Sequence, residues 1–60
     1  MSRRSAEAVF QGLFLLTDIR GTLRETAPHH QLTDEQKVKT AKTLEKLEKQ
    51  ISIIREELIV

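Results

Sequence analysis

Apolar residues recur at helical spacing in two stretches of the chain, residues 5–26 and residues 34–58, so each stretch predicts one helix. Pro28 lies between them and disfavours helical geometry at the preceding residue, which ends the first helix. Residues 27–33 then form a connector of the length usual between neighbouring helices. Because a short connector makes the helices antiparallel neighbours, we expect residues 1–60 to form one all-α domain, an antiparallel helical hairpin.

The two predicted helices differ in how clearly the sequence marks their starts. Thr33-Asp34-Glu35-Gln36 matches a capping box, in which the Thr hydroxyl accepts from the backbone N–H of Gln36 and the Gln side chain bonds back to Thr33. For the first helix, Ser2 and Ser5 are both candidate caps. The start of the second helix is therefore predicted more sharply than that of the first.

The second helix is apolar along one stripe. Its residues at spacings of three and four alternate as in a coiled-coil seam, and the opposite face is charged. This pattern predicts an outer helix that contacts a neighbour on one side. The stripe consists of Leu44, Leu47, Ile51, Ile54 and Leu58.

The first helix is apolar or small around most of its circumference. Its polar residues Glu7, Gln11, Asp18, Thr22 and Glu25 fall in a wedge only about 60° wide on a helical wheel. One partner helix cannot cover side chains that point in several directions, so we expect a second contact with another chain. The candidate partner or oligomer interface is Val9, Phe10, Leu13, Phe14, Leu15, Leu16, Ile19 and Leu23, with Ile53, which lies off the stripe of the second helix.

The length of the chain points to association as well. A domain of 60 residues buries only about 60% of its unfolded surface, and one hairpin seam cannot offset the entropy lost on ordering the chain. We therefore expect two hairpins to form a four-helix bundle, with the first helices inside and the second helices outside. In that arrangement we expect Leu15 to contact the other chain.

The residue types present exclude several kinds of chemistry. There is no cysteine, so the chain forms neither disulfides nor thiolate metal sites. His29 and His30 are adjacent and supply at most two metal ligands, fewer than a metal site needs. No nucleophile and base are fixed in one cleft, and Gly12 and Gly21 are isolated rather than part of a phosphate-binding loop. We expect no enzyme activity, no metal and no cofactor.

Four arginines provide an alternative function. Arg20 and Arg24 lie one turn apart, Arg3 and Arg4 lie near the N-terminus, and a dimer doubles the set, which could bind RNA or DNA. Against this, acidic residues share the first helix, the formal net charge is only +1, and both phenylalanines belong to the apolar face. A small nucleic-acid-binding regulator is therefore the alternative hypothesis.

The two ends of the chain carry further signals. Arg3 and Arg4 before an apolar stretch are typical of a targeting peptide, but residues 12–16 are too short an apolar run for one, and no stretch is long enough to cross a membrane. We expect a cytoplasmic protein. At the other end, Glu56 and Glu57 oppose the helix dipole, so we expect another group to hold them. Ile59 and Val60 beyond them are either disordered, cap the bundle or contact a partner.

Part of the chain resembles a known family. Residues 19–51, with Leu32-Thr33-Asp34-Glu35 opening a helix and Leu44-Glu45-Lys46-Leu47 following, resemble the small aspartyl-phosphate phosphatase hairpins. The motif of that family is Ser-Gln-Glu-Leu-Asp, whereas this chain has Ala41-Lys42-Thr43-Leu44-Glu45, without the serine and with the longer acid. The resemblance therefore implies the hairpin and not the phosphatase activity. The layout is also similar to Rop-type RNA-binding hairpin dimers and to the small co-chaperones of type III secretion needles, in shape alone.

From these patterns we expect a small protein-binding regulator, adaptor or chaperone that acts through the apolar face of its first helix. Its partner is another protein, and it forms a homodimer or a higher oligomer. The surplus of apolar residues in the first helix is the feature on which this expectation depends.

Overall fold

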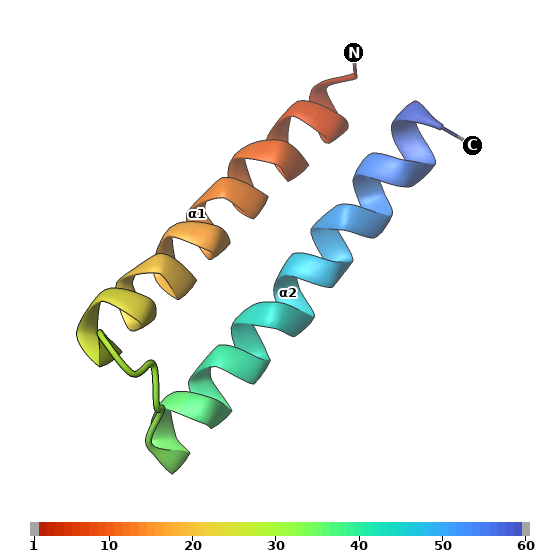
Figure 1. The fold of residues 1–60 in the computed structure, drawn as a ribbon. Helices are drawn as coiled ribbons and strands as arrows, with labels where there is room; N and C mark the ends of the chain where they lie inside the picture. The colour runs from red at the N-terminus through yellow and green to blue at the C-terminus, as the bar shows by residue number, and fades with distance from the viewer. Residues whose placement is uncertain (1, 60) are drawn as a thin grey trace.

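The computed structural model describes residues 2–59, which form two antiparallel helices, α1 (Arg3–Thr26) and α2 (Asp34–Leu58) (Figure 1). The predicted all-α helical hairpin is confirmed. The molecule measures 39 × 16 × 14 Å, so it is a slender rod, a single layer of two helices. Both chain ends lie at one end of this rod and the connector lies at the other (Figure 1).

Helix α1 begins at Arg3, two residues before the predicted start, because Ser2 rather than Ser5 is its N-cap. The Ser2 hydroxyl oxygen accepts from the backbone N–H of Ser5 at 3.1 Å, and the Ser5 hydroxyl donates to the Ser2 carbonyl at 2.8 Å. Since these bonds use one of the backbone N–H groups that a helix start leaves without a partner, they fix where α1 begins.

The start of α2 is the capping box that the sequence predicts. The backbone N–H of Gln36 donates to the Thr33 hydroxyl at 3.2 Å, and the Thr33 N–H donates to the Gln36 side-chain oxygen at 2.8 Å. Asp34 and Glu35 occupy the first turn, where negative charge is favourable to the helix dipole.

The connector follows from Pro28, which cannot continue a helix. Helix α1 ends at Thr26, and Ala27 is already extended before the cis Ala27–Pro28 peptide bond. His30 has a φ of 55°, in the left-handed region, and its N–H donates to the carbonyl of Thr26 at 2.8 Å. The connector is exposed except for the half-buried Leu32.

The seam between the helices is lined by small and polar residues more than by large apolar ones. Ser5, Ala8 and Gly12 are the buried residues of α1, and half-buried residues continue the same three-and-four spacing toward the connector. On α2 nothing is fully buried. The half-buried residues that complete the seam are Leu15, Ile19, Thr22 and Thr26 on α1, and Gln36, Thr40, Thr43, Leu47, Gln50, Ile54 and Glu57 on α2.

This seam corrects the predicted contact stripe of α2. Leu47 and Ile54 belong to the seam, whereas Leu44, Ile51 and Leu58 remain 43–48% exposed. The physical reason is that Leu47 is the α2 residue that packs against the small residues of α1: a Cβ built on Gly12 would lie 3.6 Å from Leu47 Cδ1, in ordinary van der Waals contact.

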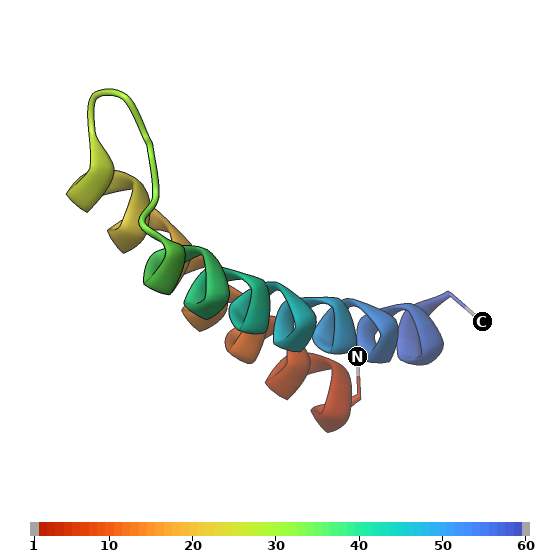
Figure 2. The ribbon, with the colours of Figure 1, turned by 90° about the horizontal axis from the view of Figure 1, so that it is seen from below.

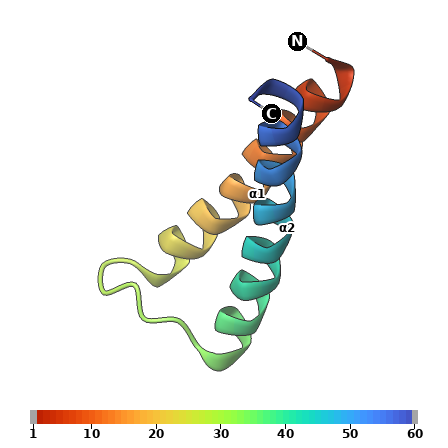
Figure 3. The same ribbon diagram turned by 90° about the vertical axis from the view of Figure 1, so that its right-hand side faces the viewer.

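The separation of the helices changes along the rod. They lie close together near the chain ends and further apart toward the connector (Figure 3), and they cross at an angle when the rod is seen from below (Figure 2). The three buried residues of α1 all lie in its first half, in agreement with the close approach at that end.

Candidate interaction surface

The hairpin leaves most of its large apolar side chains in solvent. Ala8, at 2% exposure, is the only buried hydrophobic residue among those that the structure describes. By contrast, Phe10, Leu13 and Phe14 are 63%, 56% and 66% exposed. The intramolecular seam therefore uses the small residues of α1 and leaves the large ones available for another contact.

Two stripes of exposed apolar residues flank the seam, one on each helix. Every member follows directly after a seam residue, about 100° further around its helix. Because the two helices are antiparallel, a rotation of about 100° from the seam leads to the same side of the hairpin on α1 and on α2. We call this surface the two-helix apolar face. It consists of Val9, Leu13, Leu16 and Leu23 on α1, and of Leu44, Ile51 and Leu58 on α2.

The opposite side of the hairpin is polar. Gln11, Asp18 and Glu25 each precede a seam residue of α1, and Lys39 and Lys46 do so on α2. By the same geometry these five residues lie on one side, opposite the two-helix apolar face. The hairpin thus has one mainly charged side and one mainly apolar side, although the apolar side also carries four charged residues that follow seam residues, Arg20, Lys37, Glu48 and Arg55.

Phe10 and Phe14 form a separate ridge, the phenylalanine ridge. Each lies two residues beyond a buried seam residue, Ala8 or Gly12, which is about 200° around the helix. They therefore lie on the side of α1 that is turned away from α2, one helical turn apart.

Three of the predicted interface residues lie elsewhere. Leu15 and Ile19 are half-buried and continue the line of Ala8 and Gly12 toward α2. Of Leu15 and Phe14, Leu15 is thus the one that faces α2, and its expected contact with another chain stays a prediction. Ile53 is half-buried at the polar edge of the seam.

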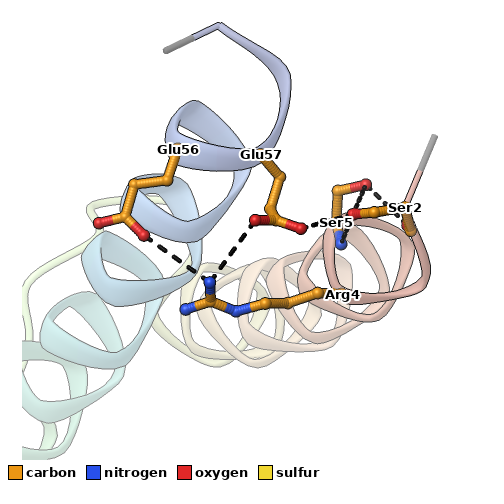
Figure 4. A network of polar contacts seen from close by, with 5 residues as sticks. All are labelled: Ser2, Arg4, Ser5, Glu56 and Glu57. Carbon is orange, nitrogen blue, oxygen red and sulfur yellow. Dashed lines mark hydrogen bonds and ion pairs between the residues drawn. The ribbon is translucent and has the colours of Figure 1, made fainter.

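The start of α1 and the end of α2 are held together by what we call the terminal clasp, in which Arg4 contacts Glu56 and Glu57 and Ser2 contacts Glu57 (Figure 4). Ser2, the N-cap of α1, also accepts from the N–H of Ser5. A guanidinium nitrogen of Arg4 lies 3.8 Å from Glu56 and 3.6 Å from Glu57, and the Ser2 hydroxyl donates to Glu57 at 2.7 Å. These contacts supply the group that the paired acids at the end of α2 were expected to need.

The four arginines divide into two pairs. Arg3 bonds to Glu7 at 3.2 Å and Arg4 belongs to the terminal clasp, so both have carboxylate partners. Arg20 and Arg24 have no ion pair with any of residues 2–59. With Thr17 and Gly21 they line an open hollow of about 240 Å³ on α1.

The remaining candidate features are the two histidines, the helix lengths and the C-terminal residues. His29 and His30 are exposed in the connector, and residues 2–59 contain no group of three or more side chains that could hold a metal ion. Neither helix in the described part of the chain is long and apolar enough to cross a membrane. Ile59 is exposed at the end of α2, and Val60 lies outside the described residues.

Comparison with known proteins gives no family for this chain. No family model matches it, and neither a curated protein nor a solved structure is significantly similar to it.

Sequence reasoning missed the two-helix apolar face because it assigned the stripe of α2 to the seam. The signal was present in the first helix, where the small residues Ser5, Ala8 and Gly12 share one face at a spacing of three and then four. Small residues at this spacing mark the side on which another helix can approach most closely, and large residues then lie beside it.

Proposed function

We propose that this chain is a small, non-enzymatic, cytoplasmic protein-binding regulator, adaptor or chaperone that acts through the apolar side chains of α1. One observation supports it above the others: Phe10, Leu13 and Phe14 are each more than half exposed, while Ala8 is the only buried hydrophobic residue of residues 2–59. Soluble proteins rarely expose a large contiguous apolar surface unless it binds a partner.

The proposal includes association of the hairpin with itself. A lone layer of two helices has no second layer against which to bury its apolar side, and closed helical domains need at least two. We propose a dimer of hairpins that packs as a four-helix bundle. Folding and dimerisation would then be one transition that depends on protein concentration.

The phenylalanine ridge is the proposed contact for a larger protein. Two aromatic side chains one turn apart are the kind of anchor by which a helix binds an apolar groove. They also carry a large apolar area each, and aromatic residues dominate the energetics of protein interfaces. Phe10 and Phe14 would enter such a groove together.

A capture experiment with the full chain tests this function. The double variant Phe10→Ser with Phe14→Ser removes the ridge at exposed positions, so the hairpin should keep its helicity. The matched control, Lys42→Ser with Lys49→Ser, changes two exposed residues of α2. We expect the wild type and the control to retain the same partner from the native cell, and the phenylalanine variant to lose it. Retention of that partner by the phenylalanine variant contradicts the proposal.

Nucleic-acid binding is the second candidate, and one observation favours it: Arg20 and Arg24 line a hollow without an acidic partner among residues 2–59. A salt titration separates the two functions. Binding to phosphates weakens linearly in log[salt], with a slope of about −0.7 to −0.9 for each phosphate contact, whereas binding to an apolar groove changes little. Arg20→Gln with Arg24→Gln should reduce the slope only if nucleic acid is the partner.

A further inference from the structure

We infer that the two-helix apolar face is the surface on which a second copy of this chain packs, so that the dimer interface is built from both helices and excludes the phenylalanine ridge. This inference rests on the proposed dimer of hairpins and specifies its contact. The face consists of the residues defined above, with Leu16 near its centre on α1 and Ile51 on α2.

The exposed area of the hairpin is what a second copy would need to cover. A compact monomer of 6.9 kDa exposes about 4,000 Å². The hairpin exposes 5068 Å², roughly 1,000 Å² more. In a standard protein interface each partner hides about 800 Å². The additional exposed area of one hairpin is therefore about as large as the area that each partner buries in one such interface.

The spacing of apolar residues on this face suits packing against an identical hairpin. Val9, Leu16 and Leu23 recur every seven residues along α1, as do Leu44, Ile51 and Leu58 along α2. The two stripes lie side by side and have equal spacing, so a second hairpin can pack its own two stripes against them. Two hairpins stacked in this way form a closed four-helix bundle.

The charges of the hairpin favour this side over the other. The opposite side carries Asp18 and Glu25 on α1 with Lys39 and Lys46 on α2, and burying those charges against a copy would be costly. The apolar side carries fewer charges, and they are of both signs, because Arg20, Glu48 and Arg55 also follow directly after seam residues. Two copies can therefore pair these charges with opposite ones.

The phenylalanine ridge lies outside this interface. Phe10 and Phe14 are on the side of α1 away from α2, whereas the face includes residues of both helices. A second copy on the face leaves these two rings accessible in the dimer. Self-association and partner binding thus use different surfaces of α1.

Thiol protection tests the assignment without disturbing the fold. The chain has no cysteine, so a single introduced thiol is the only one present. Leu16→Cys and Ile51→Cys place it on the face; Phe14→Cys and Val38→Cys are matched controls at exposed apolar positions of the same helices. In the full chain we expect maleimide labelling at positions 16 and 51 to slow as protein concentration rises, about fivefold at a total concentration of ten times the dissociation constant. The controls should label at a constant rate.

Charge substitution gives the complementary measurement. By sedimentation, Ile51→Glu should weaken self-association at least about 100-fold, whereas Val38→Glu should leave it unchanged. Concentration-dependent protection at 14 and 38, with 16 and 51 freely labelled, overturns the assigned face while leaving the dimer intact. A wild-type chain that sediments as a compact monomer at high concentration overturns the proposed dimer itself and this inference with it. If Ile51→Glu is unfolded, labelling of the cysteine variants alone decides the assignment.

Discussion

The two ends of the hairpin are built differently. Near the chain ends the helices lie close together, the buried residues Ser5, Ala8 and Gly12 line the seam, and the terminal clasp crosses it. Toward the connector the helices separate, and the seam consists of half-buried residues such as Ile19 and Thr22. Both ends have similar helices with good caps, so the difference comes from the size of the seam residues.

This difference shows why the hairpin exposes so much apolar surface. Close approach of two helices requires small side chains between them, and small side chains bury little apolar area. The large residues of the closely packed half, such as Phe10 and Leu13, are therefore left outside the seam. The closest contact within the chain and the largest surface available for another chain occur in the same part of α1.

A larger side chain at Ala8 should have the largest effect on stability. Ala8 is 2% exposed, so Ala8→Leu has no space for its extra carbons and should cost about 2 kcal/mol by overpacking. Urea unfolding at fixed protein concentration measures this. The matched control is Thr22→Leu in the more open half, which should cost less than half as much. Equal losses at both positions would show that the two ends do not differ in closeness of packing.

Removal of the α2 cap should have the next largest effect. Thr33→Ala removes the acceptor for the Gln36 N–H and half of the capping box, at a cost of about 1 kcal/mol. Thr33→Ser keeps the hydroxyl and should retain most of the stability. Thermal unfolding of the three chains at one concentration checks this. A Thr33→Ala variant as stable as Thr33→Ser would mean that the connector end does not depend on its cap.

The two glycines of α1 test how much room the seam has. A Cβ on Gly21 meets nothing within 4 Å, and one on Gly12 would be in ordinary contact with Leu47 at 3.6 Å. Each Gly→Ala substitution should therefore stabilise the chain by about 0.5–1 kcal/mol through helix propensity. Denaturant titration of both variants gives the comparison. Stabilisation by Gly21→Ala together with destabilisation by Gly12→Ala would place the helices closer than the seam described above.

The terminal clasp should have the smallest effect. Arg4→Gln removes contacts of 3.6 and 3.8 Å to two carboxylates that are partly in solvent, so it should cost less than about 1 kcal/mol. The loss should shrink at 1 M salt, where the screening length is about 3 Å. Thermal unfolding at low and high salt measures both quantities. A cost that is independent of salt would assign the role of Arg4 to packing of its side-chain carbons.

Much of the hairpin could be predicted from a few residues. Pro28 ends one helix and the capping box at Thr33 opens the next, because both act through the local backbone. The start of α1 was ambiguous, since Ser2 and Ser5 are equally good caps by type, and the structure uses the hydroxyls of both in one turn.

The candidate surface could be predicted only in part. The surplus of apolar residues on α1 was evident from the wheel, and Phe10, Leu13 and Phe14 are indeed exposed. The residues by which α2 contacts α1 were not evident from the sequence. Hydrophobicity alone favours Leu44 and Ile51 as contact residues, whereas the structure uses Thr43 and Gln50 beside them. Which residues meet depends on the distance between helices, and that distance is set by the small residues of the other helix.

The position of the close contact also fixes the order in which the hairpin can assemble. The bond from Ser2 to Glu57 joins residues 55 positions apart, whereas contacts beside the connector close short loops. Because the entropy of loop closure grows with loop length, we expect a hairpin of this kind to form from its connector toward its chain ends. The best-packed segment would then form last. Contacts formed after the transition state slow unfolding more than they speed folding, so Ala8 and its neighbours set the lifetime of the folded hairpin rather than the rate at which it appears.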